Sequence, residues 1–213
     1  MEHRPSRFPD PRAAPADAPL AVGGDLAAAT LLDAYAHGIF PWPLDLELLT
    51  WWSPDPRGVM PLERLHVSRT LRRTLRRGRF ATTVDRAFAA VVAGCAQRDE
   101  TWITPALADS FATLHELGFA RSVEVWDERG ELTGGVYGVV LGGVFAGESM
   151  FHTATDASKV ALVALVERLR ARGFALFDVQ LLTSHLASMG AVEVARDEYL
   201  DLLAGALTVP ARW

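Results

Sequence analysis

The pattern of apolar and polar positions predicts an α+β protein. Strict alternation indicates strands, and apolar positions three or four residues apart indicate helices. The predicted helices cover residues 27–36, 68–77, 85–96, 105–117, 157–172, 184–189 and 197–203. The predicted strands cover residues 80–84, 122–126, 132–140, 143–151, 174–180 and 192–194.

Three consecutive strands precede the most clearly amphipathic helix, residues 157–172, and a buried strand follows it. Glycines between the three strands are typical of hairpin turns. This β-β-β-α-β-α order resembles an acetyltransferase-like (GNAT) mixed-sheet core, although a topology alone does not fix function. We expect a disordered lead-in over residues 1–19, rich in Pro, Ala and Arg, a small N-terminal domain over 20–60, and the GNAT-like domain over 61–213.

The composition indicates the cellular compartment in which the protein is expected. Half of the 213 residues are apolar, and Cys95 is the single cysteine, which excludes a disulfide framework and a Cys-based metal site and suits a reducing cytoplasm. The first residues lack the apolar core of a signal peptide. The uncharged stretch 132–147 is too short to span a bilayer and rich in glycine, so it reads as a hairpin. We expect a cytoplasmic protein without membrane contact.

A basic cluster stands out against a net charge of −5. Seven arginines lie between Arg64 and Arg79, and the helix within this range carries five of them on one face, at Arg69, Arg72, Arg73, Arg76 and Arg77. A solvated basic face is the plainer interpretation. The contrast with the acidic average favours a local track for phosphates.

A proline- and tryptophan-rich segment, residues 38–58, is too broken to form one helix or one central strand. Its prolines hold Trp42 and two further tryptophans on rigid, irregular backbone. These rings either fill the core of a domain edge or form flat walls of a cleft.

Three polar side chains occur in otherwise apolar strands. Asp178 and Gln180 are two residues apart and emerge on one face of the strand over 174–180, where they either cap the following helix or present a joint acceptor. Glu148 lies in the segment GESMF, on the opposite face from Phe145 if the strand alternates regularly. Such a glutamate either pairs with a base such as Lys159 or faces a ligand cavity.

Several motifs together resemble the bacterial leucyl/phenylalanyl-tRNA–protein transferases over about residues 8–204. They are AVGGDL at 21–26, GIFPW at 38–42, WWSPDPR at 51–57, TWIT at 101–104, GESMF at 147–151, DASK at 156–159 and FDVQ at 177–180. The resemblance implies transfer of leucine or phenylalanine, with methionine as a third candidate, from aminoacyl-tRNA to the α-amino group of proteins with N-terminal Arg or Lys. The product is a bacterial N-degron. Aminolysis of an activated ester needs no cofactor and no metal.

The resemblance also implies roles for individual residues. Asp178 and Gln180 match the family's proposed catalytic pair, with Asp178 orienting Gln180 and Gln180 accepting a hydrogen bond from the acceptor amine. Glu148 matches a functional glutamate that attracts the cationic acceptor. The positions expected to hold the tRNA end are Arg69, Arg73, Arg76 and Arg77. The residues expected to form the pocket for the adenosine and the amino-acid side chain are Trp42, Trp102, Val136, Phe145, Met150, Leu165 and Phe177.

Two other classes of function stay open at this point. One is another GNAT-fold transferase, which uses acyl-coenzyme A or aminoacylates a peptidoglycan precursor. The other is a non-catalytic module that binds the tRNA end or an N-degron. Acceptance of coenzyme A donors, or binding without transfer, would identify them. We expect a monomer, because no apolar seam of an obligate dimer is visible.

Overall fold

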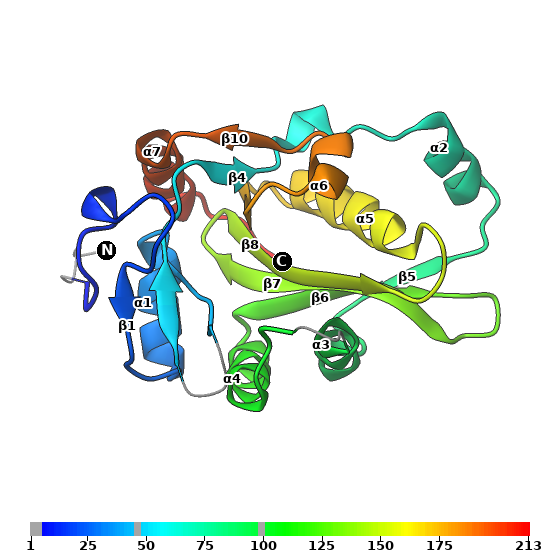
Figure 1. Cartoon of the computed structure of the whole chain (residues 1–213). Helices are drawn as coiled ribbons and strands as arrows, with labels where there is room; N and C mark the ends of the chain where they lie inside the picture. Colours follow the sequence, from blue (N-terminus) through cyan, green and yellow to red (C-terminus); the bar gives the residue numbers. More distant parts are fainter. Residues whose placement is uncertain (1–5, 45–47, 98–100) are drawn as a thin grey trace.

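The computed structural model describes residues 6–44, 48–97 and 101–213. A seven-stranded sheet dominates it, with helices against both faces (Figure 1). The strand order is β10-β4-β9-β8-β7-β6-β5, antiparallel except for the parallel pair β8 and β9. The strands are β4 (Arg57–Val59), β5 (Ala81–Val84), β6 (Ala120–Trp126), β7 (Leu132–Leu141), β8 (Val144–His152), β9 (Leu176–Gln180) and β10 (Val192–Val194).

Most helices begin and end within two residues of their predicted bounds. They are α1 (Ala28–Ala36), α2 (Arg69–Arg76), α3 (Phe88–Ala96), α4 (Pro105–Glu116), α5 (Ala157–Ala171), α6 (Ser184–Ser188) and α7 (Arg196–Leu207), with short 3-10 turns η1 (Pro11–Ala13) and η2 (Leu62–Arg64). The succession β6-β7-β8-α5-β9-α6 confirms the predicted GNAT-like order. Among the described residues, no helix combines the length and apolar character needed to cross a membrane.

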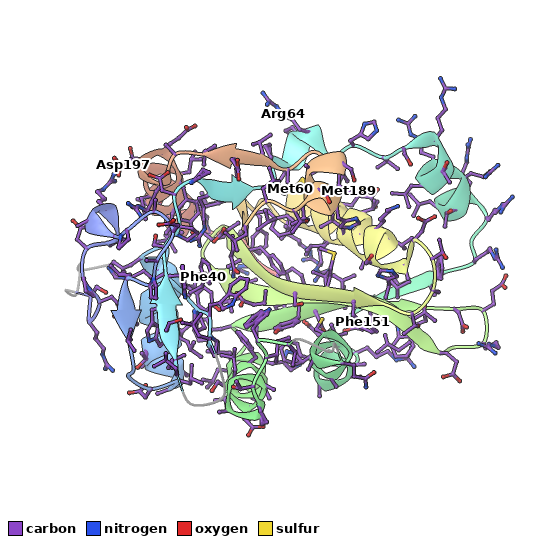
Figure 2. All side chains as sticks on the ribbon, in the orientation of Figure 1. Phe40, Met60, Arg64, Phe151, Met189 and Asp197 are labelled. Carbon is purple, nitrogen blue, oxygen red and sulfur yellow. The ribbon has the colours of Figure 1, made fainter. Side chains whose placement is uncertain are left out.

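Two apolar layers enclose the sheet. On one face, α5 packs against β6, β7 and β8, and this layer includes Met60 and Met189, which Figure 2 labels. On the other face, α1, α3 and α4 cover β6 and β7, and this layer includes Phe40. A smaller cluster around Tyr199 seats α7 against β8 and β9. The candidate site lies where β8 and β9 run next to each other.

The N-terminal unit contains a small sheet of order β1-β3-β2, formed by β1 (Ala21–Val22), β2 (Phe40–Pro41) and β3 (Thr50–Trp52). The proline-rich segment then enters the large sheet as β4, between β9 and β10. The domain boundary expected after residue 60 therefore comes after β4 in the sequence, although this strand belongs to the large sheet.

Residues 6–19 differ from the disordered lead-in expected over 1–19, whose first five residues lie outside the described part. The buried guanidinium of Arg196 donates to the carbonyl oxygens of Ala14 at 2.7 Å and Pro15 at 3.1 Å. Arg12 pairs with Asp197 and Asp201 at 2.8 and 2.6 Å. These contacts tie the segment to the start of α7, which sequence composition alone does not reveal.

Candidate active site

A pocket of about 290 Å³ opens where β8 and β9 run side by side in parallel. The tryptophan-rich segment, β7, β8, β9 and α6 all contribute to its wall. The lining residues are Trp42, Trp102, Val136, Gly147, Glu148, Ser149, Met150, Phe177, Val179, Gln180, Leu181, Thr183, His185 and Leu186. A mainly apolar wall that carries a few polar groups is the usual character of a small-molecule site.

The tryptophans Trp42 and Trp102 form one edge of this pocket. Their rings stack with centroids 5.6 Å apart and planes 22° apart. Trp42 follows β2 directly, and Thr50 fixes its backbone. The Trp42 N–H donates to the Thr50 carbonyl oxygen at 2.8 Å, and the Thr50 hydroxyl donates to the Trp42 carbonyl oxygen. Trp102 precedes α4, whose first turn Thr104 caps by accepting from the N–H of Leu107 at 3.2 Å.

The predicted apolar pocket residues divide into two groups. Val136, Met150 and Phe177 line the pocket, whereas Phe145 and Leu165 do not. Phe145 is fully buried and packs edge-to-face on Phe177 with centroids 5.4 Å apart. Leu165 is fully buried in the layer between α5 and the sheet. The structure therefore places these two residues behind the pocket lining, not in it.

Glu148 owes its position to an irregularity in β8. Gly147 pairs with Gly138 and Ser149 pairs with Tyr137, so Glu148 is an extra residue in this strand. Such a β-bulge re-aims side chains and reverses the alternation beyond it. Phe145 and Met150 therefore contact the same core layer, contrary to the regular alternation that the sequence suggested.

The Glu148 carboxyl is buried in the pocket wall and contacts Gln180, not a basic residue. Gln180 Nε2 donates to Glu148 Oε1 at 2.9 Å. Lys159, the basic partner that the sequence offered, pairs with Asp156 at 3.2 Å instead. Burial raises the pKa of Glu148 to about 8, and the nearby Tyr35 hydroxyl opposes this rise. The second carboxyl oxygen, Glu148 Oε2, accepts no hydrogen bond of ordinary geometry. A carboxyl group that titrates near neutral pH is suited to proton transfer.

Asp178 lies behind the pocket, not in its lining. Arg57 donates to it twice, from Nε to Oδ1 at 2.9 Å and from Nη2 to Oδ2 at 2.7 Å, and the Tyr199 hydroxyl donates to Oδ2 at 2.8 Å. The predicted link between Asp178 and Gln180 exists, but it runs through the backbone: Gln180 N–H donates to Asp178 Oδ1 at 2.8 Å. The side-chain amide of Gln180 turns the other way, toward Glu148.

The arginines of α2 are exposed, and this helix lies at the end of the molecule opposite the N-terminal sheet (Figure 1). Ser68 caps the helix and Leu71 anchors it in the core, while Arg69, Arg73, Arg76 and Arg77 face solvent. Leu75, on the same helix, is 37% exposed. Thr74 donates to Asp156 at 3.1 Å and thereby joins α2 to the start of α5, next to the strand that carries Glu148.

Sequence reasoning missed four residues around the site. Arg57 and Tyr199 hold Asp178, and Tyr35 lies against Glu148. His185 enters the pocket wall from α6. Arg57 stood within the motif WWSPDPR, but its partner is 121 residues away, so no local signal connects the two.

Comparisons with known proteins agree on one family. Residues 59–204 match the family model described as leucyl/phenylalanyl-tRNA protein transferase, and residues 24–55 match the model of its N-terminal domain. The leucyl/phenylalanyl-tRNA–protein transferase of Stutzerimonas stutzeri (strain A1501) is 52% identical over 196 residues, which cover 90% of this chain and 86% of the relative. The protein of the same name from Anaeromyxobacter sp. (strain Fw109-5) is 53% identical over 214 residues, covering 97% and 91%.

A solved structure of L-PGS from Bacillus licheniformis aligns with a TM-score of 0.50 at 11% identity, over 86% of this chain and 71% of that chain. At this identity the likeness concerns the fold alone. The sequence comparisons cover both the small N-terminal unit and the large sheet with its pocket. This chain belongs to the leucyl/phenylalanyl-tRNA–protein transferase family.

Proposed function

We propose that this protein transfers leucine or phenylalanine from the 3′ end of aminoacyl-tRNA to the α-amino group of a protein that begins with Arg or Lys. The observation that carries the proposal is the pocket itself: an apolar chamber with two tryptophans at its edge and the Glu148–Gln180 pair in its wall. The apolar chamber and its tryptophans suit an aminoacyl ester, and the Glu148–Gln180 pair suits an attacking amine.

The reaction exchanges one acyl bond for another. The acceptor nitrogen forms a bond to the ester carbonyl carbon, the bond from that carbon to the ribose oxygen breaks, and the proton lost by the amine ends on the ribose hydroxyl. Because the ester is already activated, holding both substrates together supplies much of the rate, and effective molarities of about 10⁵ M or more are known for well-oriented groups.

Gln180 and Glu148 have complementary roles in this proposal. Gln180 Nε2 is engaged by Glu148, which leaves Gln180 Oε1 to accept a hydrogen bond from the acceptor amine. A neutral amide is a poor base, so the proton passes to the ribose 2′-hydroxyl or to a water. Burial raises the pKa of Glu148 to about 8, so an entering cationic N-terminus favours the ionised carboxylate, which then attracts that N-terminus.

The apolar chamber selects the amino acid. Val136, Met150 and Phe177 provide a surface that accepts an unbranched or γ-branched side chain and excludes polar ones by desolvation. A β-branched side chain is rejected by shape, where one methylene is worth about 1–3 kcal/mol. Trp42 and Trp102 offer flat faces for the terminal adenine.

The exposed arginines of α2 hold the backbone of the tRNA acceptor end. Few phosphates are contacted, so binding is salt-dependent and does not read the tRNA sequence. We propose that the protein works in the cytoplasm, where aminoacyl-tRNA is available. One copy of the chain carries all the groups used here, so we also propose a monomer.

The test is transfer by the purified protein from labelled Leu-tRNA or Phe-tRNA to three peptides that differ only in an N-terminal Arg, Lys or Ala. The proposal predicts labelled products with Arg and Lys and none with Ala. Intact tRNAs and folded protein without any product would refute it, and acyl-coenzyme A donors would then be tried.

A further inference from the structure

Arg57 is buried in a cage that links three parts of the chain. Its guanidinium centre lies 4.7 Å from the ring centroid of Phe40 in β2 and 4.4 Å from that of Tyr199 in α7. Nη1 donates to the carbonyl oxygen of Gly38 at 3.1 Å. Only 1% of the residue is exposed. Burial by itself would lower the pKa of Arg57, but the Asp178 carboxylate outweighs that effect and keeps it raised, so the charge is permanent.

The Asp178 carboxylate accepts four hydrogen bonds from other groups of the protein. Its two oxygens accept from Arg57 twice, from the Tyr199 hydroxyl and from the backbone N–H of Gln180. It does not line the pocket. A carboxylate engaged in this way has no free position from which to take a proton from an amine.

The backbone at Gln180 explains why such rigidity is needed. Gln180 has φ +63°, in the left-handed region that side-chain-bearing residues rarely adopt. Leu181 N–H donates to the Val179 carbonyl at 2.8 Å, which closes a three-residue turn around Gln180. Strained backbone of this kind persists only where surrounding contacts over-determine it. Here the side chain of Asp178 holds the Gln180 N–H.

We propose that Arg57 is a positioning residue for the transfer reaction: with Tyr199 it fixes the Asp178 carboxylate, which holds the Gln180 backbone so that the side-chain amide meets Glu148 in the pocket wall. Asp178 is then a positioning residue as well, and Glu148 and Gln180 are the groups that face the substrates. This inference rests on the function proposed above.

A lysine cannot replace Arg57 in this arrangement. Two parallel hydrogen bonds to one carboxylate, with the flat group held between two rings, require a planar guanidinium. Lysine keeps the charge but offers one point of contact, so the Asp178 carboxylate can rotate. It then no longer holds the Gln180 backbone N–H in place. Displacement of a reacting group by about 1 Å is enough to cost about 100-fold in rate.

The test is a double-mutant cycle between Arg57→Lys and Gln180→Asn, measured as kcat and KM for transfer from Leu-tRNA to an Arg-peptide. Asparagine tolerates left-handed backbone, but its shorter side chain moves the amide group away from Glu148. In the wild-type background Arg57→Lys should lower kcat by about 100-fold and leave KM for Leu-tRNA nearly unchanged. In the Gln180→Asn background it should change kcat by less than about threefold, since the group it positions is already lost.

Arg196 provides the matched control. It is also a buried arginine, but it donates to the carbonyl oxygens of Ala14, Pro15 and Ser53 and not to Asp178. Arg196→Lys should lower thermal stability and leave kcat of the folded protein unchanged in both backgrounds. A buried arginine that acts only on stability would behave in this way.

Equal losses of kcat from Arg57→Lys in both backgrounds would overturn the inference, because Arg57 would then act independently of Gln180. If Arg57→Lys fails to fold, Tyr199→Phe replaces it in the cycle, since this change removes a single donor 2.8 Å from Asp178. A several-fold loss of kcat that disappears with Gln180→Asn supports the inference, and an undiminished loss overturns it. A wild-type protein without transfer activity would refute the proposed function and this inference together, whereas additive effects in an active enzyme refute the inference alone.

Discussion

Gln180 donates its side-chain amide to Glu148, with Nε2 and Oε1 2.9 Å apart, and this contact decides which end of the amide faces the pocket. The contact joins β8 to β9, two parallel strands that the chain connects through α5. A bulge at Glu148 and a left-handed turn at Gln180 bring the two side chains together. Both irregularities are local departures from ideal strands at the place where chemistry is proposed.

The buried Glu148 should make stability depend on pH. Burial raises its pKa from an ordinary 4.5 to about 8, so between these values the folded protein retains a proton that the unfolded chain has lost. Stability must then fall as the pH rises through this window, by about 1.4 kcal/mol per pH unit at most. Urea unfolding at pH 5 and pH 8.5 should show a Glu148→Gln variant losing several kcal/mol less than wild type. Identical pH dependence in the two proteins would contradict the assignment.

Trp102 should contribute to donor binding more than to chemistry. Loss of a ring that stacks on a base costs about 1–3 kcal/mol. We expect Trp102→Ala to raise KM for Leu-tRNA by about 5- to 100-fold, with a smaller effect on kcat. Trp126→Ala is the control, because its indole bonds to Thr83 on β5, away from the pocket. A comparable rise in KM for the control would show that the effect is not local.

Val136 should set the preference between leucine and phenylalanine. It lies opposite Met150 in the pocket wall, so Val136→Ala enlarges the chamber. The ratio of kcat/KM for Phe-tRNA over that for Leu-tRNA should rise by about tenfold. Val139→Ala makes the same change on the same strand, but in the layer under α1, α3 and α4, and should leave the ratio unaltered. A ratio that moves equally in both variants would remove Val136 from the pocket.

The arginines of α2 should determine salt dependence. An Arg73→Gln/Arg76→Gln double variant should weaken tRNA binding and reduce the slope of log KM against log salt by about 0.7 for each phosphate that is no longer neutralised. Transfer from a short aminoacyl-adenosine donor should not change. Arg129→Gln/Arg172→Gln removes the same charge from exposed positions elsewhere and should leave the slope intact. Equal slopes in the two double variants would refute the phosphate track.

Regular parts of the fold were predictable from sequence because they follow simple periods. Alternation and glycine turns located β6, β7 and β8, and the apolar face of α5 located the crossover to β9. The short strand β4 was not predictable, since three residues that include a charge, among prolines, give no strand pattern. Its assignment depends on pairing with β9 and β10, which are distant in sequence.

The start of α3 shows how a distant partner overrides a local signal. The helix was predicted to begin at Asp85, but this residue has φ +56° and its carboxylate accepts from Ser122 N–H at 2.9 Å and from Trp213 Nε1 at 2.8 Å. The helix begins at Phe88 instead, and the buried Glu124 of β6 accepts from the N–H groups of Arg86 and Ala87 that precede it. A residue of another element holds the turn that precedes the helix, so the neighbouring sequence does not indicate where the helix begins.

The candidate site was predictable in its parts and not in its connections. The residue types pointed to Glu148, Asp178 and Gln180, but a pattern with period two cannot foresee the bulge that redirects Glu148. Nor can it foresee that Asp178 is occupied by Arg57. The sequence therefore indicated the candidate groups, and the geometry separates Glu148 and Gln180, which line the pocket, from Asp178, which does not.

The most direct measurement analyses the product by mass spectrometry, using wild-type protein, Leu-tRNA and two peptides with N-terminal arginine, one free and one acetylated at the α-nitrogen. The account predicts one leucine added to the free peptide, with the new amide at the α-nitrogen of arginine, and no addition to the acetylated peptide. Leucine on the acetylated peptide, or no product from either peptide while the tRNA ester remains intact, would contradict it.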